Sequence, residues 1–208
     1  MIQIILMTEA ICPMCGRAAL DGRTHPRCQT QYSIDGLTSF FHYDGVVRKG
    51  IKVIKYRLIS DIASEFVDLI PDEMFPIQKS HNILLPIPLH SSRFRERGFN
   101  QAEVLGTCIA MRFGIQMDTK VLVRKEPTMP QVEMKDRDER LKNMANVFET
   151  NLPRRPASPN RGEQAGKTPP SHVILFDDVF TTGATMRSAA NVLKRAGATF
   201  VWAVTMAR

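Results

Sequence analysis

The fold of this chain is decided by the stretch Val173-Ile174-Leu175-Phe176-Asp177-Asp178-Val179-Phe180-Thr181-Thr182-Gly183-Ala184-Thr185. Its first four residues are apolar and are typical of a buried strand in a parallel sheet. Two carboxylates and a small turn rich in hydroxyl groups follow. Residues 186–196 then predict a helix, which Gly197 ends.

The turn between this strand and this helix predicts a phosphate site. Free backbone N–H groups and the positive end of the helix dipole stabilise an anion there, and Gly183 lets the backbone come close to it. Asp177 and Asp178 are acceptors suited to the two hydroxyls of a ribose. Three threonines add hydroxyl donors: Thr181, Thr182 and Thr185. An ordinary turn with a threonine helix cap is the alternative, but the full order of residues favours a ribose 5-phosphate ligand.

The size and charge of the chain limit its class. Its 208 residues, 43% of them hydrophobic, suffice for one α/β domain with a small appendage. A net charge of +7 favours anionic partners: polyphosphates, nucleic acid or an acidic membrane surface. We expect no transmembrane segment and no signal peptide, because no apolar run is long enough for either. A cytoplasmic location follows as an expectation, and there thiols stay reduced or bind metal.

Three of the four cysteines gather near the N-terminus in two short pairs of metal-ligand type. Cys12 and Cys15 form the first pair, and His25 and Cys28 form the second. This spacing supplies the four ligands of a tetrahedral zinc site. The segment has few large apolar residues, so metal binding would supply its folding energy. Two alternatives remain: a redox Cys-x-x-Cys pair, or an exposed His25 with a different fourth ligand.

The remaining chain predicts alternating strands and helices. We expect strands at residues 37–43, 82–89, 121–123 and 200–206, and helices at 46–70, 101–112 and 136–145. The helical pattern of residues 46–70 favours a break near residues 57–60. Residues 124–140 read as a long loop that precedes the helix at 136–145, and residues 151–171, rich in Pro, Gly and Arg, as a flexible insertion. Together the elements predict a doubly wound, mainly parallel α/β sheet, whose ligands bind at the carboxyl ends of the strands.

Two groups of basic residues are candidates for binding anions. The expected helix at residues 46–70 carries Lys49, Lys52 and Lys55, whose alternative role is that of a solvated helix face. Residues 90–101 are basic and aromatic, and their arginines either hold a pyrophosphate or form a charged loop. These arginines are Arg93, Arg95 and Arg97.

Several of these motifs together resemble the ComF family (ComFC/GntX-like), from about Ile11 to the C-terminus. The matching pieces are the cysteine pairs, Lys55-Tyr56, Pro86-Ile87-Pro88-Leu89-His90, Arg97-Gly98-Phe99-Asn100-Gln101, Gln131 with Arg140 and Asn143, and the stretch that opens this section. That stretch also resembles the phosphoribosyl-pyrophosphate (PRPP) loop of type I phosphoribosyltransferases. The chain departs from the family at His25, where a cysteine is usual, and in the length of the 151–171 insertion.

The resemblance implies a zinc-binding module at residues 8–35 and a phosphoribosyltransferase-like domain at residues 36–208. It implies binding of PRPP with Mg²⁺, and in many members a role in natural transformation with single-stranded DNA. Asp177 and Asp178 would then be catalytic. The PRPP-binding residues would be Thr181, Thr182, Gly183, Ala184, Thr185 and Arg97. The same fold also serves as a non-catalytic sensor.

Three functions therefore stay open. The first is a phosphoribosyltransferase that uses PRPP, either in DNA uptake or in nucleotide or related metabolism. The second is a single-stranded DNA-binding uptake factor, with Lys49, Lys52, Lys55, Arg93 and Arg95 as phosphate contacts. Phe94, Phe99 or Tyr56 would stack on bases in this case, although such aromatic residues more often lie in the core. The third is a non-catalytic module that docks a partner, such as a helicase of the uptake machinery.

Overall fold

A computed structural model describes residues 5–56, 60–75, 82–125, 147–151 and 170–208. Its central element is a five-stranded sheet in the order β1-β7-β6-β2-β3, in which every neighbouring pair is parallel. The strands are β1 (Gly36–Phe41), β2 (Asn82–Pro86), β3 (Gln116–Met117), β6 (His172–Val179) and β7 (Phe200–Ala207). The predicted α/β class with a mainly parallel sheet is confirmed.

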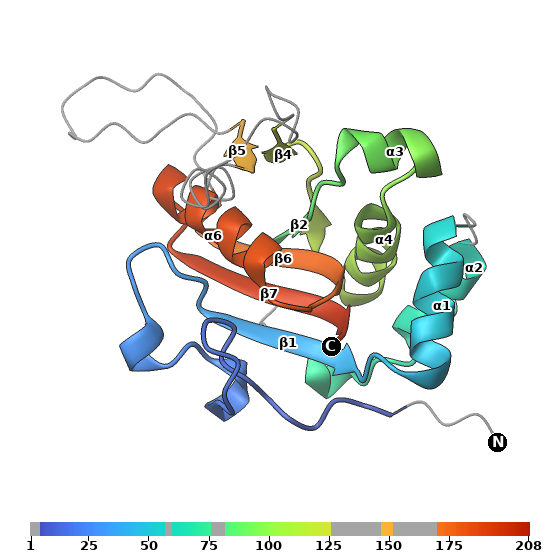
Figure 1. Cartoon of the computed structure of the whole chain (residues 1–208), viewed down its shortest axis with the longest axis horizontal. Helices are drawn as coiled ribbons and strands as arrows, with labels where there is room; N and C mark the ends of the chain where they lie inside the picture. The colour runs from blue at the N-terminus through green and yellow to red at the C-terminus, as the bar shows by residue number, and fades with distance from the viewer. Residues whose placement is uncertain (1–4, 57–59, 76–81, 126–146, 152–169) are drawn as a thin grey trace, which may run out of the picture.

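Helices cover both faces of this sheet (Figure 1). The helices are α1 (Gly45–Tyr56), α2 (Ser60–Asp68), α3 (Ser91–Arg97), α4 (Gln101–Phe113) and α6 (Ala184–Ala196). One face packs against α1, α2 and α4, around buried residues such as Ile51, Leu105 and Phe176. The other packs against α6, around Leu175 and Leu193. Because successive side chains of a strand point to opposite faces, β6 contributes alternate residues to the two cores.

The topology places a switch point between two central strands. From β6 the chain continues through α6 to β7 on one side, and from β2 it continues through α3 and α4 to β3 on the other. The chain therefore leaves these neighbouring strands in opposite directions and over opposite faces. Ligands of doubly wound sheets bind at such a switch point, outside the carboxyl ends of the strands.

Several expected elements are confirmed. The helical pattern of residues 46–70 corresponds to α1 and α2, and its expected break near residues 57–60 lies mostly outside the described residues. Residues 90–101 contain the helix α3, which was not predicted. The expected strand near residues 121–123 is β4 (Leu122–Arg124), which pairs antiparallel with β5 (Phe148–Thr150), outside the main sheet. β3 and β5 were not predicted. The helix expected at 136–145, the loop at 124–140 beyond Lys125, and most of the 151–171 insertion lie outside the described residues.

The N-terminal segment lies along the free edge of β1 and over the α6 face. Met7 N–H donates to the Phe40 carbonyl at 2.8 Å, and His42 N–H donates to the Ile5 carbonyl at 3.1 Å. Short 3₁₀ turns follow at η1 (Leu20–Gly22) and η2 (Pro26–Cys28), and another, η3 (Asp72–Met74), follows α2. Ile11 and Met14 pack against the core beneath α6. In the part of the chain that the structure describes, no helix is long and apolar enough to cross a membrane.

Candidate functional site

The two aspartates of the β6–α6 connection lie inside β6 itself. Asp177 pairs in register with Thr205 of β7, and Val179 pairs with Ala207, so the strand continues past both carboxylates. The sequence placed them directly after the strand. Their position within it puts the two side chains on opposite faces of the sheet.

Asp178 is buried and paired with a cation. Its Oδ2 lies 2.7 Å from Nζ of Lys55, which reaches it from α1. Only 6% of the Asp178 side chain and 21% of the Lys55 side chain are exposed. The structure thus brings together two residues for which the sequence predicts different roles. Lys55, a candidate DNA contact, forms an ion pair with Asp178, a candidate acceptor for ribose hydroxyls. The pairing itself was not predicted.

Asp177 is only partly buried, yet the pKa of its carboxyl group is well above the ordinary value. Removal from water and the nearby charge of Asp178 raise the pKa of Asp177 to about 8, although its own bond from Asp178 N–H and the charge of Lys55 act in the opposite direction. The carboxyl group of Asp177 is therefore mostly protonated at neutral pH. A protonated carboxyl can donate a hydrogen bond as well as accept one.

The turn after β6 has the geometry of an anion site. We call residues 181–185 the phosphate turn. Thr181 and Thr182 are exposed, and Ala184 and Thr185 are partly exposed. Gly183 has a φ of +73° and caps α6, whose first N–H groups point into the turn. A Cβ at Gly183 would lie 2.4 Å from the ring of Phe180, so this position requires glycine.

The Arg97-Gly98-Phe99-Asn100-Gln101 motif joins α3 to α4. Gly98, at a φ of +77°, ends α3, and the Asn100 side chain caps α4 by accepting from Ala102 N–H at 3.1 Å. The Asn100 amide also donates to the Ile87 carbonyl at 3.0 Å. Since Ile87 N–H donates to the carbonyl of Phe176 in β6, the motif is tied to the strand that carries the aspartates. Arg97 donates to Gln101 at 3.1 Å.

The other basic candidates are exposed. Lys49 and Lys52 are exposed on α1, and Arg93 and Arg95 on α3. Phe94, between these arginines in the sequence, exposes 49% of its surface, whereas aromatic side chains most often lie in the core. An exposed ring flanked by two arginines is suited to stacking on bases while the cations contact phosphates.

The four predicted metal ligands converge. Cys12, Cys15, His25 and Cys28 each offer a ligand atom, and these atoms all lie within 4.8 Å of one another. Nδ1 of His25 lies 3.4 Å from Sγ of Cys15, and Nε2 lies 2.9 Å from the Ala18 carbonyl. A ring bound to zinc through Nδ1 would donate its Nε2–H to that carbonyl, the usual way in which a histidine ligand is oriented. The donor set fits zinc.

The polar surroundings of Cys12 suit a thiolate ligand. Burial raises the pKa of Cys12, but the backbone N–H groups of His25, Cys15 and Met14 outweigh it and lower the pKa below its ordinary value. Burial and the neighbouring thiols Cys15 and Cys12 raise the pKa of Cys28. Three thiols this close favour a cation among them, which would remove their mutual repulsion.

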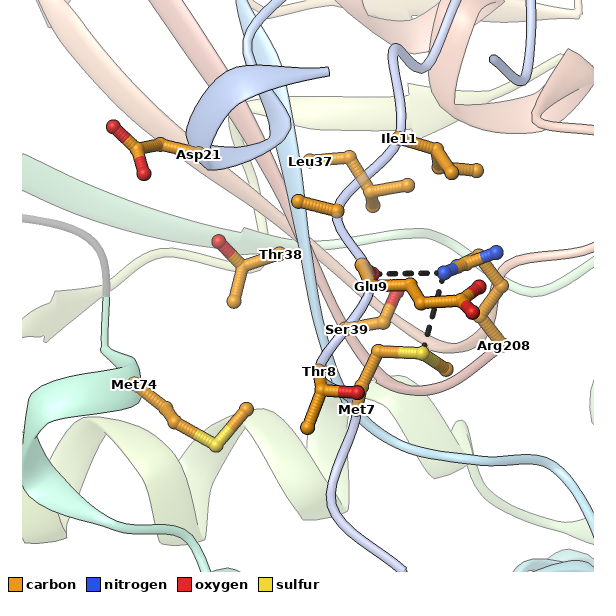
Figure 2. Close-up of a pocket in the computed structure, with 11 residues that line it drawn as sticks. Met7, Thr8, Glu9, Ile11, Asp21, Leu37, Thr38, Ser39, Met74 and Arg208 are labelled. Atoms are coloured by element: carbon orange, nitrogen blue, oxygen red, sulfur yellow. Dashed lines mark hydrogen bonds between the residues drawn. The ribbon is translucent and has the colours of Figure 1, made fainter. Parts of the chain in front are cut away.

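Two cavities adjoin the N-terminal segment. One, of about 380 Å³, lies between the cysteine cluster and the phosphate turn, and Cys15, Thr181 and Thr182 are among its lining residues. The other, of about 280 Å³, lies between residues 7–11 and β1 (Figure 2). Across its mouth Arg208 donates to the Glu9 carbonyl at 2.9 Å and to Sδ of Met7 at 3.2 Å. None of the described site candidates lines this second cavity, so the first is the one associated with the predicted chemistry.

Comparison with known proteins agrees with the resemblance drawn from the motifs. The chain is 29% identical over 203 residues to the DNA utilization protein YhgH of Salmonella typhimurium, covering 92% of this chain and 81% of that protein. It is 28% identical over 209 residues to the competence protein ComFC of Bacillus subtilis, covering 92% and 74%. Competence protein F of Haemophilus influenzae is 27% identical over 114 residues, covering 55% and 44%. No protein-family model matches the chain. The similarity to ComF-type proteins that the motifs predict is confirmed.

Loss of a ligand should weaken metal binding strongly. We expect the purified protein to contain about one zinc per chain and His25→Ala to lower zinc affinity by about 100-fold or more, because four ligands share a binding free energy of roughly 10–16 kcal/mol. Elemental analysis and chelator competition measure this. His172→Ala, which removes an exposed histidine of β6, is the control. Unchanged affinity in His25→Ala would mean that another group is the fourth ligand.

The raised pKa of Asp177 makes folding stability depend on pH. Because its folded pKa of about 8 exceeds the unfolded value near 4, its contribution is fully present below about pH 4 and is lost as the pH rises through 8. Urea unfolding at pH 5 and pH 8 should show Asp177→Asn losing less stability over this interval than the wild type, by about 1–3 kcal/mol after allowance for partial exposure. Asp68→Asn, on the exposed surface of α2, should match the wild type. Equal pH dependence in all three proteins would contradict the assignment.

Proposed function

We propose that the protein binds PRPP at the carboxyl ends of β6 and β2 and acts with single-stranded DNA in DNA uptake in the cytoplasm. The observation that carries the PRPP proposal is the phosphate turn. An exposed run of hydroxyls, a glycine at positive φ and a 13-residue helix follow a strand that carries two aspartates close to its carboxyl end. The names of YhgH and ComFC, which refer to DNA utilization and to competence, support the DNA part of the proposal.

In this proposal each residue acts through the geometry already described. Backbone N–H groups of the phosphate turn and the hydroxyls of Thr181, Thr182 and Thr185 hold the 5-phosphate. Asp177, mostly protonated near neutral pH, can donate to a ribose hydroxyl as well as accept from one, while Asp178, paired with Lys55 on the other face of the sheet, helps to raise the pKa of Asp177. Arg97, at the end of α3, is the candidate for the pyrophosphate.

The reaction that suits this arrangement is a phosphoribosyl transfer. An acceptor attacks C1 of the ribose, the bond from C1 to the pyrophosphate oxygen breaks, and the electron pair leaves with pyrophosphate. Cationic and N–H donors around the leaving group would stabilise the charge that develops there. Mg²⁺, when bound with PRPP, neutralises charge on the pyrophosphate. Since Asp178 is already paired and Asp177 is mostly protonated, we expect Mg²⁺ to be bound mainly through ligand oxygens and water.

PRPP binding should depend on the shape of the phosphate turn. Gly183→Ala places a Cβ against Phe180 and should weaken binding by about 30-fold or more, as expected when charged hydrogen bonds are lost. Calorimetric titration of PRPP with and without Mg²⁺ measures the effect, with Asp177→Asn/Asp178→Asn as a second variant. Gly114→Ala is the matched control, because its φ of +65° imposes similar strain and a Cβ there would meet no atom within 4 Å. A wild-type protein that is folded and zinc-loaded but binds no PRPP would refute the proposal.

A single-stranded DNA surface on α3 is favoured by the exposed Phe94 between Arg93 and Arg95. We expect Arg93→Glu/Arg95→Glu to lower affinity for a single-stranded oligonucleotide by about tenfold or more, and to reduce the dependence of log K on log salt by about 1.4, the value for two phosphate contacts. Phe94→Ala should lower affinity with little change in salt dependence. Fluorescence anisotropy across a salt series measures both.

The matched control for these variants is Arg23→Glu/Lys120→Glu, which reverses two exposed charges on other segments. If this control weakens binding as much as the α3 variants, the protein's overall charge and not the α3 surface attracts DNA. Lys49→Glu/Lys52→Glu tests the face of α1 in the same assay. Lys55 is left unchanged because it neutralises Asp178. Binding of a helicase partner through the zinc-binding module, residues 8–35, remains a separate proposal.

A further inference from the structure

Arg187 connects the cysteine cluster to the phosphate turn. It lies in the first turn of α6, and its Nη1 donates to the Thr182 carbonyl at 2.8 Å and to the Pro13 carbonyl at 3.0 Å. A guanidinium Nη atom carries two hydrogens, so it can serve both carbonyls at once. One carbonyl belongs to the phosphate turn and the other to the first cysteine pair, and 174 sequence positions separate Pro13 from Arg187.

The Pro13 carbonyl is fixed by the metal-ligand segment. Cys12, the preceding residue, is completely buried, and its thiol accepts from His25 N–H at 3.5 Å. Its backbone is tied to Arg17 and Gly16 by hydrogen bonds of 2.8 and 2.9 Å. Pro13 itself is buried. The position of its carbonyl therefore depends on how the four candidate ligands are held together.

On the other side, the Arg187 guanidinium packs over the glycine of the phosphate turn. A Cβ on Gly183 would approach Nη1 of Arg187 to 2.8 Å, and Arg187 N–H donates to the Gly183 carbonyl at 2.9 Å. Arg187 also lines the cavity of about 380 Å³ between the cluster and the turn. The guanidinium binds the Thr182 carbonyl. The N–H groups that would bind an anion lie at the opposite ends of the peptide units, so an anion at the turn would lie on the side away from the guanidinium.

We propose that Arg187 is a positioning residue through which metal bound at Cys12, Cys15, His25 and Cys28 orders the phosphate turn. With the metal bound, the Pro13 carbonyl stays in place and Arg187 holds Thr182 and Gly183 in the conformation that accepts an anion. Without it, the Pro13 end of the bridge is released. Coupling of this kind is reciprocal, so a ligand bound at the turn tightens metal binding by the same factor. Only this last consequence rests on the proposed PRPP binding.

Hydrogen–deuterium exchange of the intact chain, zinc-loaded and after chelation, tests the coupling without any activity assay. In the wild type, removal of zinc should speed exchange of the amides of residues 181–185 by about tenfold or more. In Arg187→Ala these amides should already exchange fast with zinc bound, and chelation should change them little. Amides of the α6 interior report whether the whole helix has been destabilised instead.

Arg17→Ala is the matched control, because it removes an exposed arginine of the zinc-binding module and leaves the Pro13 contact in place. It should respond to chelation as the wild type does. Exchange at residues 181–185 that is indifferent to zinc in the wild type would overturn the proposal. An equal response to chelation in Arg187→Ala and the wild type would also overturn it.

Titration of PRPP separates this inference from the proposed function. If zinc protects residues 181–185 through Arg187 but PRPP does not bind, the proposed function is wrong and the coupling stands. If PRPP binds with the same affinity to the zinc-loaded and the chelated wild type, the coupling is wrong and the PRPP site stands. If both hold, we expect chelation to weaken PRPP binding about tenfold in the wild type and not in Arg187→Ala.

Discussion

The candidate site depends on the pairing of β6 on both sides, with β2 and with β7. The strand stays in the sheet through Val179, so alternation sends Asp177 and Asp178 to opposite faces. A fully buried carboxylate would be costly without a partner. Lys55 supplies it for the buried Asp178, whereas Asp177 lies partly exposed on the other face, where removal from water and the charge of Asp178 raise its pKa to about 8. One geometric rule thus gives two adjacent aspartates different surroundings.

The sequence predicted those parts of the fold that have their own periodic signal. β1, β2, β6 and β7 were expected from short apolar runs, and α1 and α2 from apolar residues three and four positions apart. α3 was not predicted, because its seven residues carry several charges and show no apolar stripe. Its signals are at the ends, where the His90 side chain accepts from Ser92 N–H and Gly98 adopts a positive φ. β3 and β5, of two and three residues, exist only through pairing with strands distant in sequence.

The candidate site, like the fold, has one part that the sequence predicted and another that it did not. The phosphate turn and the metal ligands were predictable because their residues are close in sequence and their types match the chemistry. Contacts between distant segments were not: nothing in the local sequence of α1 pairs Lys55 with Asp178, and nothing near Pro13 indicates Arg187. The position of Arg187, one helical turn after Gly183, does indicate that it faces the phosphate turn. That signal could have identified it as a residue acting on the turn.

β1 illustrates what this topology demands of the folding chain. Among the strands that the structure describes, only β7 pairs with it in the main sheet, and the contact between Ser39 and Thr205 spans 166 positions. Pairing over such a separation requires closure of a very long loop and is slow. Until β7 has been synthesised, one hydrogen-bonding edge of β1 has no native partner strand, and an unpaired edge is a site of aggregation. The N-terminal segment already lies within reach of the opposite edge through Met7 and Phe40. During synthesis, therefore, the chain can protect one side of its first strand early, and the other side only late.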